Sequence, residues 1–218
     1  MKHAIITGSS RGIGLALTKV LIHRKDFKII GSSTSGKHPI KANNFECYRL
    51  NLNDEKSIKK FVGNVQHLKI DYLFNNAGIL VDSNGDPKID LKKLEQTFSV
   101  NLFGTMQLTE LLIPHLTKNA HIINISSGWG SFSEKNFDAF NPHYKMSKAA
   151  LNMYTKLLSE RLKSAGITVS AFDPGWVKTD MGGANADRTS EEVADELMDL
   201  MSKSETGKFW HQGSSREW

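Results

Sequence analysis

Residues 4–14 of the chain read Ala-Ile-Ile-Thr-Gly-Ser-Ser-Arg-Gly-Ile-Gly, a short apolar run that leads directly into three closely spaced glycines. The run predicts a buried strand, and the apolar stripe of Ile13, Leu17 and Leu21 predicts a helix immediately after it. Glycines let the turn between them bend tightly and approach an anion closely. The helix N-terminus offers unpaired N–H groups to a phosphate. This stretch therefore predicts a nucleotide-phosphate site at the end of the first strand.

Beyond this turn, short β-type runs alternate with longer helical stretches as far as the end of the chain. Alternation of this kind predicts βαβ units, and so an α/β fold with a doubly wound parallel sheet and helices on both faces. Nothing in the 218 residues resembles a linker or a repeat, so we expect one domain over residues 1–218. The expected strands are 3–7, 27–31, 45–50, 72–75, 120–125, 167–172 and 208–210, and the expected helices are 13–24, 55–64, 91–116, 144–165 and 190–202.

The composition excludes several functional classes. No apolar run approaches the ~20 residues of a membrane span, and no signal-peptide core precedes the first glycine. We therefore expect a cytoplasmic protein that does not bind membranes. The net charge is +5, but lysines are interleaved with acids, which argues against nucleic-acid binding. The single cysteine, Cys47, and the scattered histidines predict no metal site.

The region after the second expected strand bears on which dinucleotide binds. A site that prefers NAD usually has an acid about 20 residues after the glycine loop, which holds the ribose 2′-hydroxyl. Residues 27–45 contain no acid, but Ser33 and Thr34 are present there, and Arg11 lies in the loop. Hydroxyls and a cation suit a 2′-phosphate. NADP is therefore expected and NAD is less favoured, with an ordinary polar loop as the alternative.

Tyr144 and Lys148 lie four residues apart at the start of a strong helix pattern. Residues at this spacing share one helix face, so the ammonium group lies near the phenol. A nearby cation favours the phenolate and lowers its pKa toward a value useful in acid–base catalysis. A Tyr–Lys pair taken alone is more often an ordinary surface pair, so other motifs must support the hypothesis.

Small polar residues follow two other expected strands. Ser126 and Ser127 come after the fifth strand, and the turn at 75–78 comes after the fourth. The carboxyl ends of parallel strands are where ligands bind in such sheets. Either serine is a candidate to hold a carbonyl oxygen, and the alternative for both is a turn hydroxyl. Asn101 lies in an apolar setting, where a purely structural role is a serious alternative.

Taken in order along the chain, these motifs resemble the short-chain dehydrogenase/reductase family. The matching segments are Thr-Gly-x-x-x-Gly-x-Gly at 7–14, Asn-Asn-Ala-Gly at 75–78, Asn101, Ser127, Tyr-x-x-x-Lys at 144–148 and Pro-Gly at 174–175. The stretch 173–183 is similar to the C-factor and sniffer-like carbonyl reductases. The match covers nearly the whole chain.

The resemblance implies a Rossmann fold and a catalytic tetrad of Asn101, Ser127, Tyr144 and Lys148. Ser127 is preferred to Ser126 because the family's serine is followed by two residues and a glycine, here Gly130. The implied cofactor contacts are Gly8, Ser10, Arg11, Gly12, Ile13, Gly14, Ser33, Thr34, Asn51, Leu52, Asn76, Ala77, Gly78, Tyr144, Lys148, Pro174, Gly175, Val177 and Thr179. No metal is implied.

The implied reaction is hydride transfer between NADP(H) and a small-molecule carbonyl or alcohol. In it Tyr144 moves the proton, Lys148 lowers the tyrosine's pKa, Ser127 positions the oxygen, and Asn101 links Lys148 to solvent through a backbone carbonyl and a water. The alternative function is a dinucleotide-binding sensor or signalling protein with little turnover. The helices at 91–116 and 144–165 resemble the pair that many relatives use to form homodimers.

Two departures from the family's pattern concern the site. Asn51 stands where relatives commonly carry an Asp beside the adenine, although its carbonyl can still accept a hydrogen bond. Residues 131–143 form an aromatic-rich insertion that either walls the substrate pocket or packs as a surface loop. We expect the pocket to be built from 80–87, 128–144 and 176–188, with a small lid at about 180–203, and to favour an apolar or aromatic carbonyl.

Overall fold

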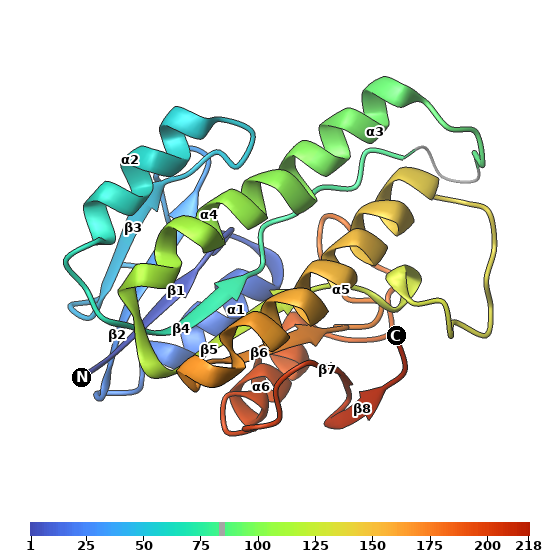
Figure 1. The fold of residues 1–218 in the computed structure, drawn as a ribbon. Helices are drawn as coiled ribbons and strands as arrows, with labels where there is room; N and C mark the ends of the chain where they lie inside the picture. Colours follow the sequence, from blue (N-terminus) through green and yellow to red (C-terminus); the bar gives the residue numbers. More distant parts are fainter. Residues whose placement is uncertain (83–85) are drawn as a thin grey trace.

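The computed structural model describes residues 1–82 and 86–218, which form one open eight-stranded sheet in the order β3-β2-β1-β4-β5-β6-β7-β8 (Figure 1). All neighbouring strands are parallel except β7 and β8. The predicted doubly wound α/β fold is confirmed. The strands are β1 (Lys2–Ile6), β2 (Phe27–Ser33), β3 (Phe45–Arg49), β4 (Ile70–Asn75), β5 (Leu116–Ile125), β6 (Thr168–Phe172), β7 (Lys208–His211) and β8 (Ser214–Arg216).

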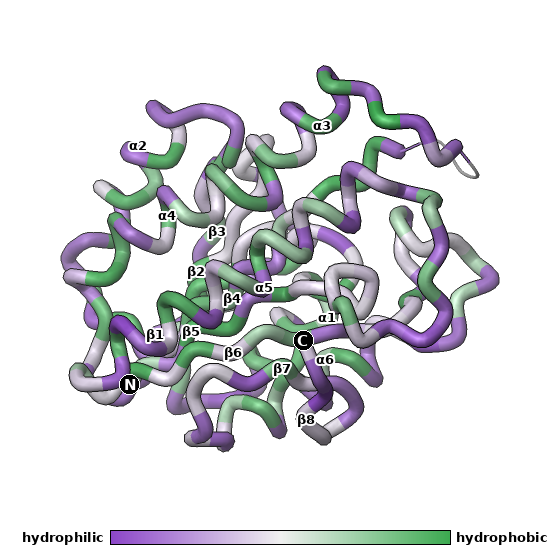
Figure 2. Tube along the Cα trace, turned by 45° about the vertical axis from the view of Figure 1, so that its right-hand side comes forward, coloured by the Kyte–Doolittle hydropathy of each residue, from purple (hydrophilic) through white to green (hydrophobic). Residues whose placement is uncertain are grey.

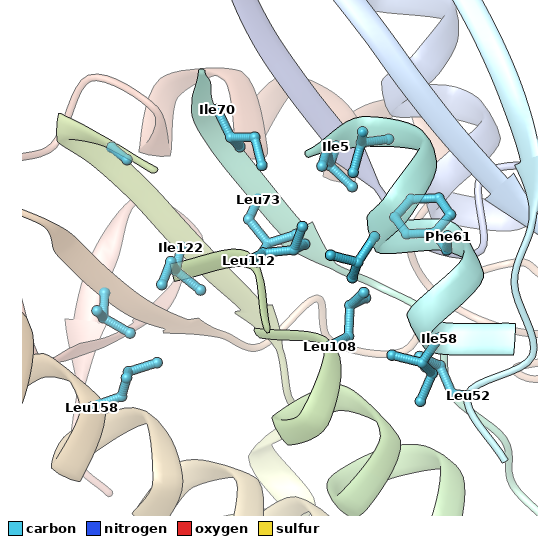
Figure 3. Close-up of a cluster of buried hydrophobic side chains, with 14 of the residues drawn as sticks. Ile5, Leu52, Ile58, Phe61, Ile70, Leu73, Leu108, Leu112, Ile122 and Leu158 are labelled. Atoms are coloured by element: carbon cyan, nitrogen blue, oxygen red, sulfur yellow. The ribbon is translucent and has the colours of Figure 1, made fainter. Parts of the chain in front are cut away.

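Helices cover both faces of this sheet. They are α1 (Gly12–Leu21), α2 (Glu55–Val65), α3 (Leu91–Phe98), α4 (Thr105–Leu112), α5 (Pro142–Leu162) and α6 (Ser190–Leu200), with helical turns η1 (Ser99–Gly104), η2 (Ile113–His115), η3 (Gly128–Gly130) and η4 (Lys163–Ala165). One core layer lies under α2, α4 and α5 and includes Phe61, Leu108 and Leu158 (Figure 3). The other lies under α1 and α6 and includes Leu17 and Leu197.

The alternation of side chains along each strand divides these two layers. In β1, Ile5 belongs to the layer under α2, α4 and α5, whereas Ala4 and Ile6 belong to the layer under α1 and α6. Because both faces of a parallel sheet are covered, the strands are apolar on both sides. Figure 2 shows this as green stretches along the central strands, in contrast to the purple outer turns of α2.

The helix predicted over residues 91–116 is present as far as His115, but it is not one regular α-helix. It is divided into α3, the π-helical turn η1, α4 and the short turn η2. At Gly104 the chain passes so close to β3's following loop that an added Cβ would lie 2.0 Å from the Leu52 carbonyl oxygen. A widened π turn accommodates one residue more than an α turn, and an apolar period of 3.6 does not distinguish the two.

Strand ends also differ from the prediction. β5 begins at Leu116, inside the predicted helix, with a register shift where β4 pairs with it between Ile70 and Tyr72. β8 was not predicted at all. It is a three-residue polar strand, Ser-Ser-Arg, with none of the apolar alternation that marks a strand. It follows β7 through a tight turn in which Gln212 and Gly213 both have positive φ.

Helix caps follow the sequence closely. Asp54 caps α2 by accepting a hydrogen bond from Lys56 N–H. Thr189 and Glu192 form a reciprocal capping box on α6. Gly166 ends the turn after α5 in the left-handed region, at φ 74°. Within residues 1–82 and 86–218, no helix has the length and apolar character needed to cross a membrane.

Candidate functional site

The glycine loop after β1 is closely packed against the turn after β4. A Cβ added to Gly14 would lie 2.5 Å from the Gly8 carbonyl oxygen and 2.6 Å from Asn76 Nδ2, and one added to Gly8 would lie 3.0 Å from Ala77 Cα. Gly8 and Gly12 have positive φ. Larger residues therefore do not fit at Gly8 or Gly14, and backbone occupies the space that side chains would fill.

The first turn of α1 is open to an anion. Arg11 is the N-cap residue and makes no side-chain cap hydrogen bond within the described part of the chain. The N–H groups of this turn consequently face away from the helix without a protein cap, which is the arrangement that binds phosphate. Ser10 and Ile13 lie half-buried in the same loop. This geometry fits the pyrophosphate of a dinucleotide.

Thr7 links the turns that follow β1 and β4. Between these two neighbouring strands the order of strands along the sheet reverses. Thr7 Oγ1 accepts hydrogen bonds from the N–H groups of Asn76 and Ala77, at 2.9 Å each. Asn76 Nδ2 donates to the carbonyl oxygens of Thr7 at 2.8 Å and Gly8 at 3.1 Å. Asn76 thus holds the loop's shape with its side chain, at the topological switch point where dinucleotides bind in such sheets.

The residues expected near a 2′-phosphate lie at the end of β2. Thr34 is exposed, whereas the Ser33 hydroxyl donates to the Lys37 carbonyl oxygen at 2.8 Å. Arg11 is largely exposed and forms an ion pair with Asp180 at 2.9 Å. An exposed pair of this kind is worth less than about 1 kcal/mol, so it does not prevent Arg11 from turning to an anion.

His38 is a residue near the loop that the sequence did not single out. Its Nε2 lies 2.8 Å from the Ser9 carbonyl oxygen, its Nδ1 accepts from Ile40 N–H at 3.1 Å, and its ring packs on Phe45. Both nitrogens are engaged, so His38 buttresses the back of the glycine loop. A lone histidine in a polar loop carries no sequence signal for this contact.

On the adenine side, the Asn51 side chain is already used locally. Its Oδ1 accepts from Asn53 N–H at 3.1 Å, while the Asn51 N–H donates to Ser57 Oγ at 2.9 Å. A carbonyl oxygen has a second lone pair, so one further hydrogen bond remains available to it. Leu52 is buried in the core beside Gly104. The close approach of its backbone to Gly104 holds this loop against η1.

Tyr144 and Lys148 lie together in the first turns of α5, as their spacing predicts. Lys148 Nζ is 5.5 Å from the centre of the Tyr144 ring and donates to the Ile125 carbonyl oxygen at 2.8 Å. Burial raises the pKa of Tyr144, the Asp173 carboxylate raises it further, and a hydrogen bond with the Ser127 side chain lowers it. Burial lowers the pKa of Lys148 to about 8.

The structure separates the two serines after β5. Ser126 is buried and its hydroxyl donates to Asn152 Oδ1 at 2.5 Å, so it is engaged in packing β5 on α5. Ser127 is half-buried and accepts from Trp129 N–H at 3.2 Å, and its hydroxyl lowers the pKa of Tyr144. Of the two, Ser127 has its hydroxyl beside the phenol.

Asn101 lies in the π-helical turn η1 and is buried. Its Oδ1 accepts from Ile79 N–H at 2.8 Å, and its Nδ2 donates to the Ile79 carbonyl oxygen at 2.9 Å and to Ser147 Oγ at 3.1 Å. A Cβ added to Gly78 would lie 3.3 Å from Asn101 Oδ1 and 3.7 Å from Lys148 Nζ. Asn101 therefore ties the turn after β4 to the helix that carries Lys148.

The segment after β6 closes on the glycine loop. Gly175 has φ 70° and donates its N–H to Asp173 Oδ1 at 3.1 Å. Thr179 lies beside Gly12, whose added Cβ would meet Thr179 Cγ2 at 3.1 Å. Val177 is buried and bridges to Arg188, and the Pro174 carbonyl oxygen accepts from Arg188 Nη1 at 2.8 Å. The contact of Thr179 with Gly12 brings the end of this segment against the glycine loop.

A buried Asp82–His143 pair, which sequence analysis did not identify, caps the helix of Tyr144. His143 Nδ1 is hydrogen-bonded to Asp82 Oδ1, and Asp82 Oδ2 accepts from Tyr144 N–H at 3.1 Å. His143 Nε2 accepts from Asp90 N–H at 2.8 Å, so the ring proton lies on Nδ1. In the sequence, the position of this histidine directly before Tyr144 is the one feature that could have indicated the pair. Residues 83–85, part of the expected pocket segment 80–87, lie outside the described residues.

Lys145 holds the aromatic-rich insertion against α5. Its Nζ donates to the carbonyl oxygen and to Oδ1 of Asp138, at 2.7 and 2.6 Å, and lies 5.4 Å from the Trp129 ring and 5.2 Å from the Phe137 ring. Trp129 in turn contacts Tyr144 edge to face, with ring centres 6.1 Å apart. The insertion therefore runs beside the start of α5, as its yellow loop in Figure 1 shows.

Residues 2–190 match the family model described as short chain dehydrogenase. The C-signal protein of Myxococcus xanthus is 32% identical over 169 residues, which cover 74% of this chain and the whole of that protein. The 3-oxoacyl-(acyl-carrier-protein) reductase FabG of Escherichia coli is 32% identical over 195 residues, covering 85% of this chain and 78% of FabG.

Solved structures are similar over the full chain. The NADPH-bound carbonyl reductase from chicken fatty liver superposes with a TM-score of 0.90 at 27% identity, covering 100% of this chain and 94% of that one. The carbonyl reductase Sniffer of D. melanogaster superposes with a TM-score of 0.86 at 27% identity, over 100% of both chains. In the parts of the chain that the structure describes, no group of three or more histidines, cysteines or acids is arranged to hold a metal ion.

Proposed function

Because the chain belongs to the short-chain dehydrogenase family of oxidoreductases, we propose that it is an NADP-dependent carbonyl reductase, acting between a small-molecule carbonyl and the corresponding alcohol. The observation that carries this proposal is the contact of Tyr144 with two other side chains. The Ser127 hydroxyl lowers the pKa of its phenol, and its ring lies 5.5 Å from Lys148 Nζ. A proton donor, an oxygen-binding hydroxyl and a cation thus meet at one point.

The proposed roles follow from these contacts. Bound NADPH would supply the hydride chemistry. Ser127 would hold the substrate oxygen beside Tyr144, whose hydroxyl would donate its proton as negative charge develops on that oxygen. Lys148 would stabilise the phenolate that remains, because a cation a few ångströms away favours the charged form. In the direction of alcohol oxidation the same groups would act in reverse.

Asn101 is proposed to complete a tetrad with these three residues. Its side-chain amide donates to Ile79 and Ser147 and accepts from Ile79, and the proposed link from Lys148 to solvent would run through its backbone carbonyl and a water. The position of Gly78 between Asn101 Oδ1 and Lys148 Nζ supports this placement. The side chain itself would fix the turn against which Lys148 rests.

NADP is proposed rather than NAD on the chemistry of the loop after β2. Segment 27–45 has no acid to accept the 2′-hydroxyl of NAD, and Thr34 is exposed there. Arg11 is tied only by an exposed ion pair. The similarity to an NADPH-bound carbonyl reductase supports the same choice. The remaining cofactor contacts are proposed as the set of residues that the family resemblance implies, of which Gly8 is the first along the chain and Thr179 the last.

The substrate is proposed to be an apolar or aromatic carbonyl. Large exposed side chains gather on the segments around Tyr144, namely Trp129, Phe132, Phe137, Phe140, Trp176 and Met181. The attachment of the insertion through Lys145 favours its role as a pocket wall over that of a detached surface loop. Residues 180–203 are proposed as a small lid that closes over this region.

The chain is further proposed to act in the cytoplasm as a homodimer. Phe103, Met153 and Leu157 are large apolar side chains left exposed on η1 and α5, and Met153 and Leu157 lie one turn apart on the same helix face. The second candidate function is a dinucleotide sensor with little turnover. The similarity to C-signal is the observation that favours this second candidate.

Oxidation of NADPH, followed by its absorbance with a panel of aldehydes, ketones and quinones, tests the proposed activity. If the protein is a carbonyl reductase, we expect turnover with at least one aromatic carbonyl and a faster reaction with NADPH than with NADH. A flat trace with every compound, together with tight NADPH binding measured by calorimetry, would favour the sensor.

A further inference from the structure

A buried charged cluster lies directly behind the turn that carries Ser127. Asp173 is 4% exposed, and its Oδ2 accepts a hydrogen bond from Arg216 Nη1. Arg216 Nη2 reaches Glu134 Oε2 at 3.0 Å. The three residues come from the end of β6, from β8 and from the aromatic-rich insertion. One guanidinium group therefore joins three segments that are distant in sequence.

The cluster is in close contact with Gly128, the residue after Ser127. A Cβ added to Gly128 would lie 2.6 Å from Arg216 Nη1, 2.8 Å from Asp173 Oδ2 and 3.0 Å from Glu134 Oε2. No side chain larger than glycine fits there without displacing the ion pair. The position of the Ser127–Gly128 turn is consequently defined by the guanidinium group and the carboxylates.

The C-terminal segment is held in place by several contacts. Arg216 lies opposite Phe209 in the β7–β8 pair, with its guanidinium 5.2 Å from that ring. Trp218 stacks on the same ring at 5.3 Å. The Glu217 carbonyl oxygen accepts from Ser131 Oγ at 3.1 Å and from Ser133 Oγ at 3.2 Å. Arg216 is thus an anchored residue rather than part of a loose tail.

We propose that Arg216 is a positioning residue of the active site, which holds Asp173 in place behind Ser127 and screens the Asp173 carboxylate from the Tyr144 phenol. The inference rests on the proposed function, and it adds to it a residue outside the motifs that the resemblance covers. Since a buried carboxylate near a phenol opposes formation of the phenolate, its partner controls how strongly that opposition is felt.

Among the described residues, several charged and titratable groups face Tyr144 and Asp173, with Glu134 beside them at Gly128. Asp173 raises the pKa of Tyr144 by its charge, and Ser127 lowers it. Lys148 faces the ring from the same helix, and Asp82 binds the backbone N–H of Tyr144. On the other side, Asp173 faces Arg216 and also His211, whose Nδ1 is 3.3 Å from Asp173 Oδ2. The guanidinium group of Arg216 cannot be deprotonated in proteins, so its charge persists through the pH profile.

Among the described residues, removal of Arg216 leaves His211 as the remaining ion-pair partner of Asp173, and it also takes the guanidinium partner from Glu134. The negative field at Tyr144 becomes stronger, and its pKa rises. In either reaction direction the midpoint of the pH profile that reports Tyr144 moves to higher pH. An effect of Arg216 on packing alone would lower the rate at all pH values without moving that midpoint.

The test is the pH dependence of kcat/KM for NADPH-dependent reduction in the full chain carrying Arg216→Met, Asp173→Asn or both. Arg216→Met is expected to raise the midpoint by about one pH unit, and Asp173→Asn to lower it. In the Asp173→Asn background, Arg216→Met should produce no further rise, because the charge that it screens is gone. Arg216→Lys should return the midpoint toward the wild-type value.

Arg161→Met is the matched control, because it removes one arginine from an exposed ion pair with Glu110 about 25 Å along α5 from Tyr144. It should leave the midpoint unchanged. An unchanged midpoint in Arg216→Met, or an equal shift in both backgrounds, would overturn the proposal for Arg216 while the proposed activity stands. If the wild-type protein shows no turnover, the proposed activity fails instead. An ultraviolet titration of tyrosinate, with Tyr144→Phe subtracted, then tests the same order of pKa values: lowest in Asp173→Asn and highest in Arg216→Met.

Discussion

Lys148 Nζ lies 5.5 Å from the centre of the Tyr144 ring while donating a hydrogen bond to the carbonyl oxygen of Ile125, the last residue of β5. The ammonium group is thus anchored to the end of β5 and lies beside the phenol ring. Burial acts on the two groups in opposite senses, since it raises the pKa of Tyr144 and lowers that of Lys148. Both effects favour neutral side chains in the free protein, but at neutral pH only the lysine is charged, so the cost in stability comes from Lys148.

Lys148→Met should stabilise the protein at neutral pH. Burial lowers the lysine's pKa from 10.5 to about 8, so below pH 8 the native state holds an ammonium that the unfolded chain would hydrate. This opposes folding by at most about 3 kcal/mol. Between pH 8 and 10.5 the native lysine loses its proton before the unfolded lysine does, so wild-type stability rises toward that of the variant.

Chemical denaturation at several pH values measures this difference. The variant's advantage should be largest below pH 8 and shrink as the pH rises through about 10. Lys163→Met, at an exposed position in η4, should show no such pH dependence. A Lys148→Met protein that is less stable than wild type at pH 7, or a difference that does not vary with pH, would contradict the burial cost.

Thr34→Asp should change the cofactor preference. Thr34 is exposed at the end of β2, so an acid there needs no repacking and would repel a 2′-phosphate while offering an acceptor to a 2′-hydroxyl. We expect the Kd for NADPH to rise by at least about tenfold, or about 1.4 kcal/mol, with NADH binding unchanged or tighter. Thr34→Asn is the uncharged control. Equal losses for both cofactors would show that the residue does not face the ribose.

Gly14→Ala should remove cofactor binding and destabilise the fold. Its Cβ would lie 2.5 Å from one backbone oxygen and 2.6 Å from the Asn76 amide, and overpacking of this kind typically costs about 1–3 kcal/mol. Gly63→Ala is the matched control, because nothing lies within 4 Å of its added Cβ and it is in the last turn of α2. That control should gain about 0.5–1 kcal/mol in thermal unfolding. Wild-type NADPH affinity in Gly14→Ala would be inconsistent with the loop's role.

Leu157→Lys should weaken self-association. Leu157 and Met153 are exposed by 64% and 61%, and a charge placed in a buried apolar interface is strongly unfavourable. Sedimentation equilibrium should give a dimer for wild type and a monomer for the variant at the same concentration. Lys163→Met is the control, because Lys163 lies in η4, after the end of α5. A wild-type monomer at micromolar concentration would contradict the proposed homodimer.

Much of this fold is encoded in local patterns. The apolar run into the glycine turn predicts β1, the phosphate loop and α1, because buried parallel strands and amphipathic helices have distinct periodicities. The spacing of Tyr144 and Lys148 is likewise local, and α5 brings them together as a helical repeat requires. The choice of Ser127 over Ser126 came from a resemblance, and the engagement of Ser126 by Asn152 now supplies its physical reason.

Features that depend on distant contacts were not predicted. Asp82 and His143 are separated by 61 residues, and neither pattern nor spacing relates them. Arg216 belongs to a polar strand whose pairing depends on a two-residue turn rather than on alternation. The π turn at η1 follows from the close approach of Gly104 to Leu52, which is a tertiary constraint. Each of these residues acts through a partner that only the folded chain supplies.

The most direct test of the proposed chemistry compares wild type with Tyr144→Phe in single-turnover oxidation of NADPH by an aromatic carbonyl that the wild type reduces. The substitution removes one hydroxyl and keeps the ring that contacts Trp129, so NADPH affinity and the unfolding temperature should remain close to wild type. Loss of a general acid should slow hydride transfer by about 10²–10⁴-fold. A Tyr144→Phe protein that oxidises NADPH at the wild-type rate would contradict the central role given to this tyrosine.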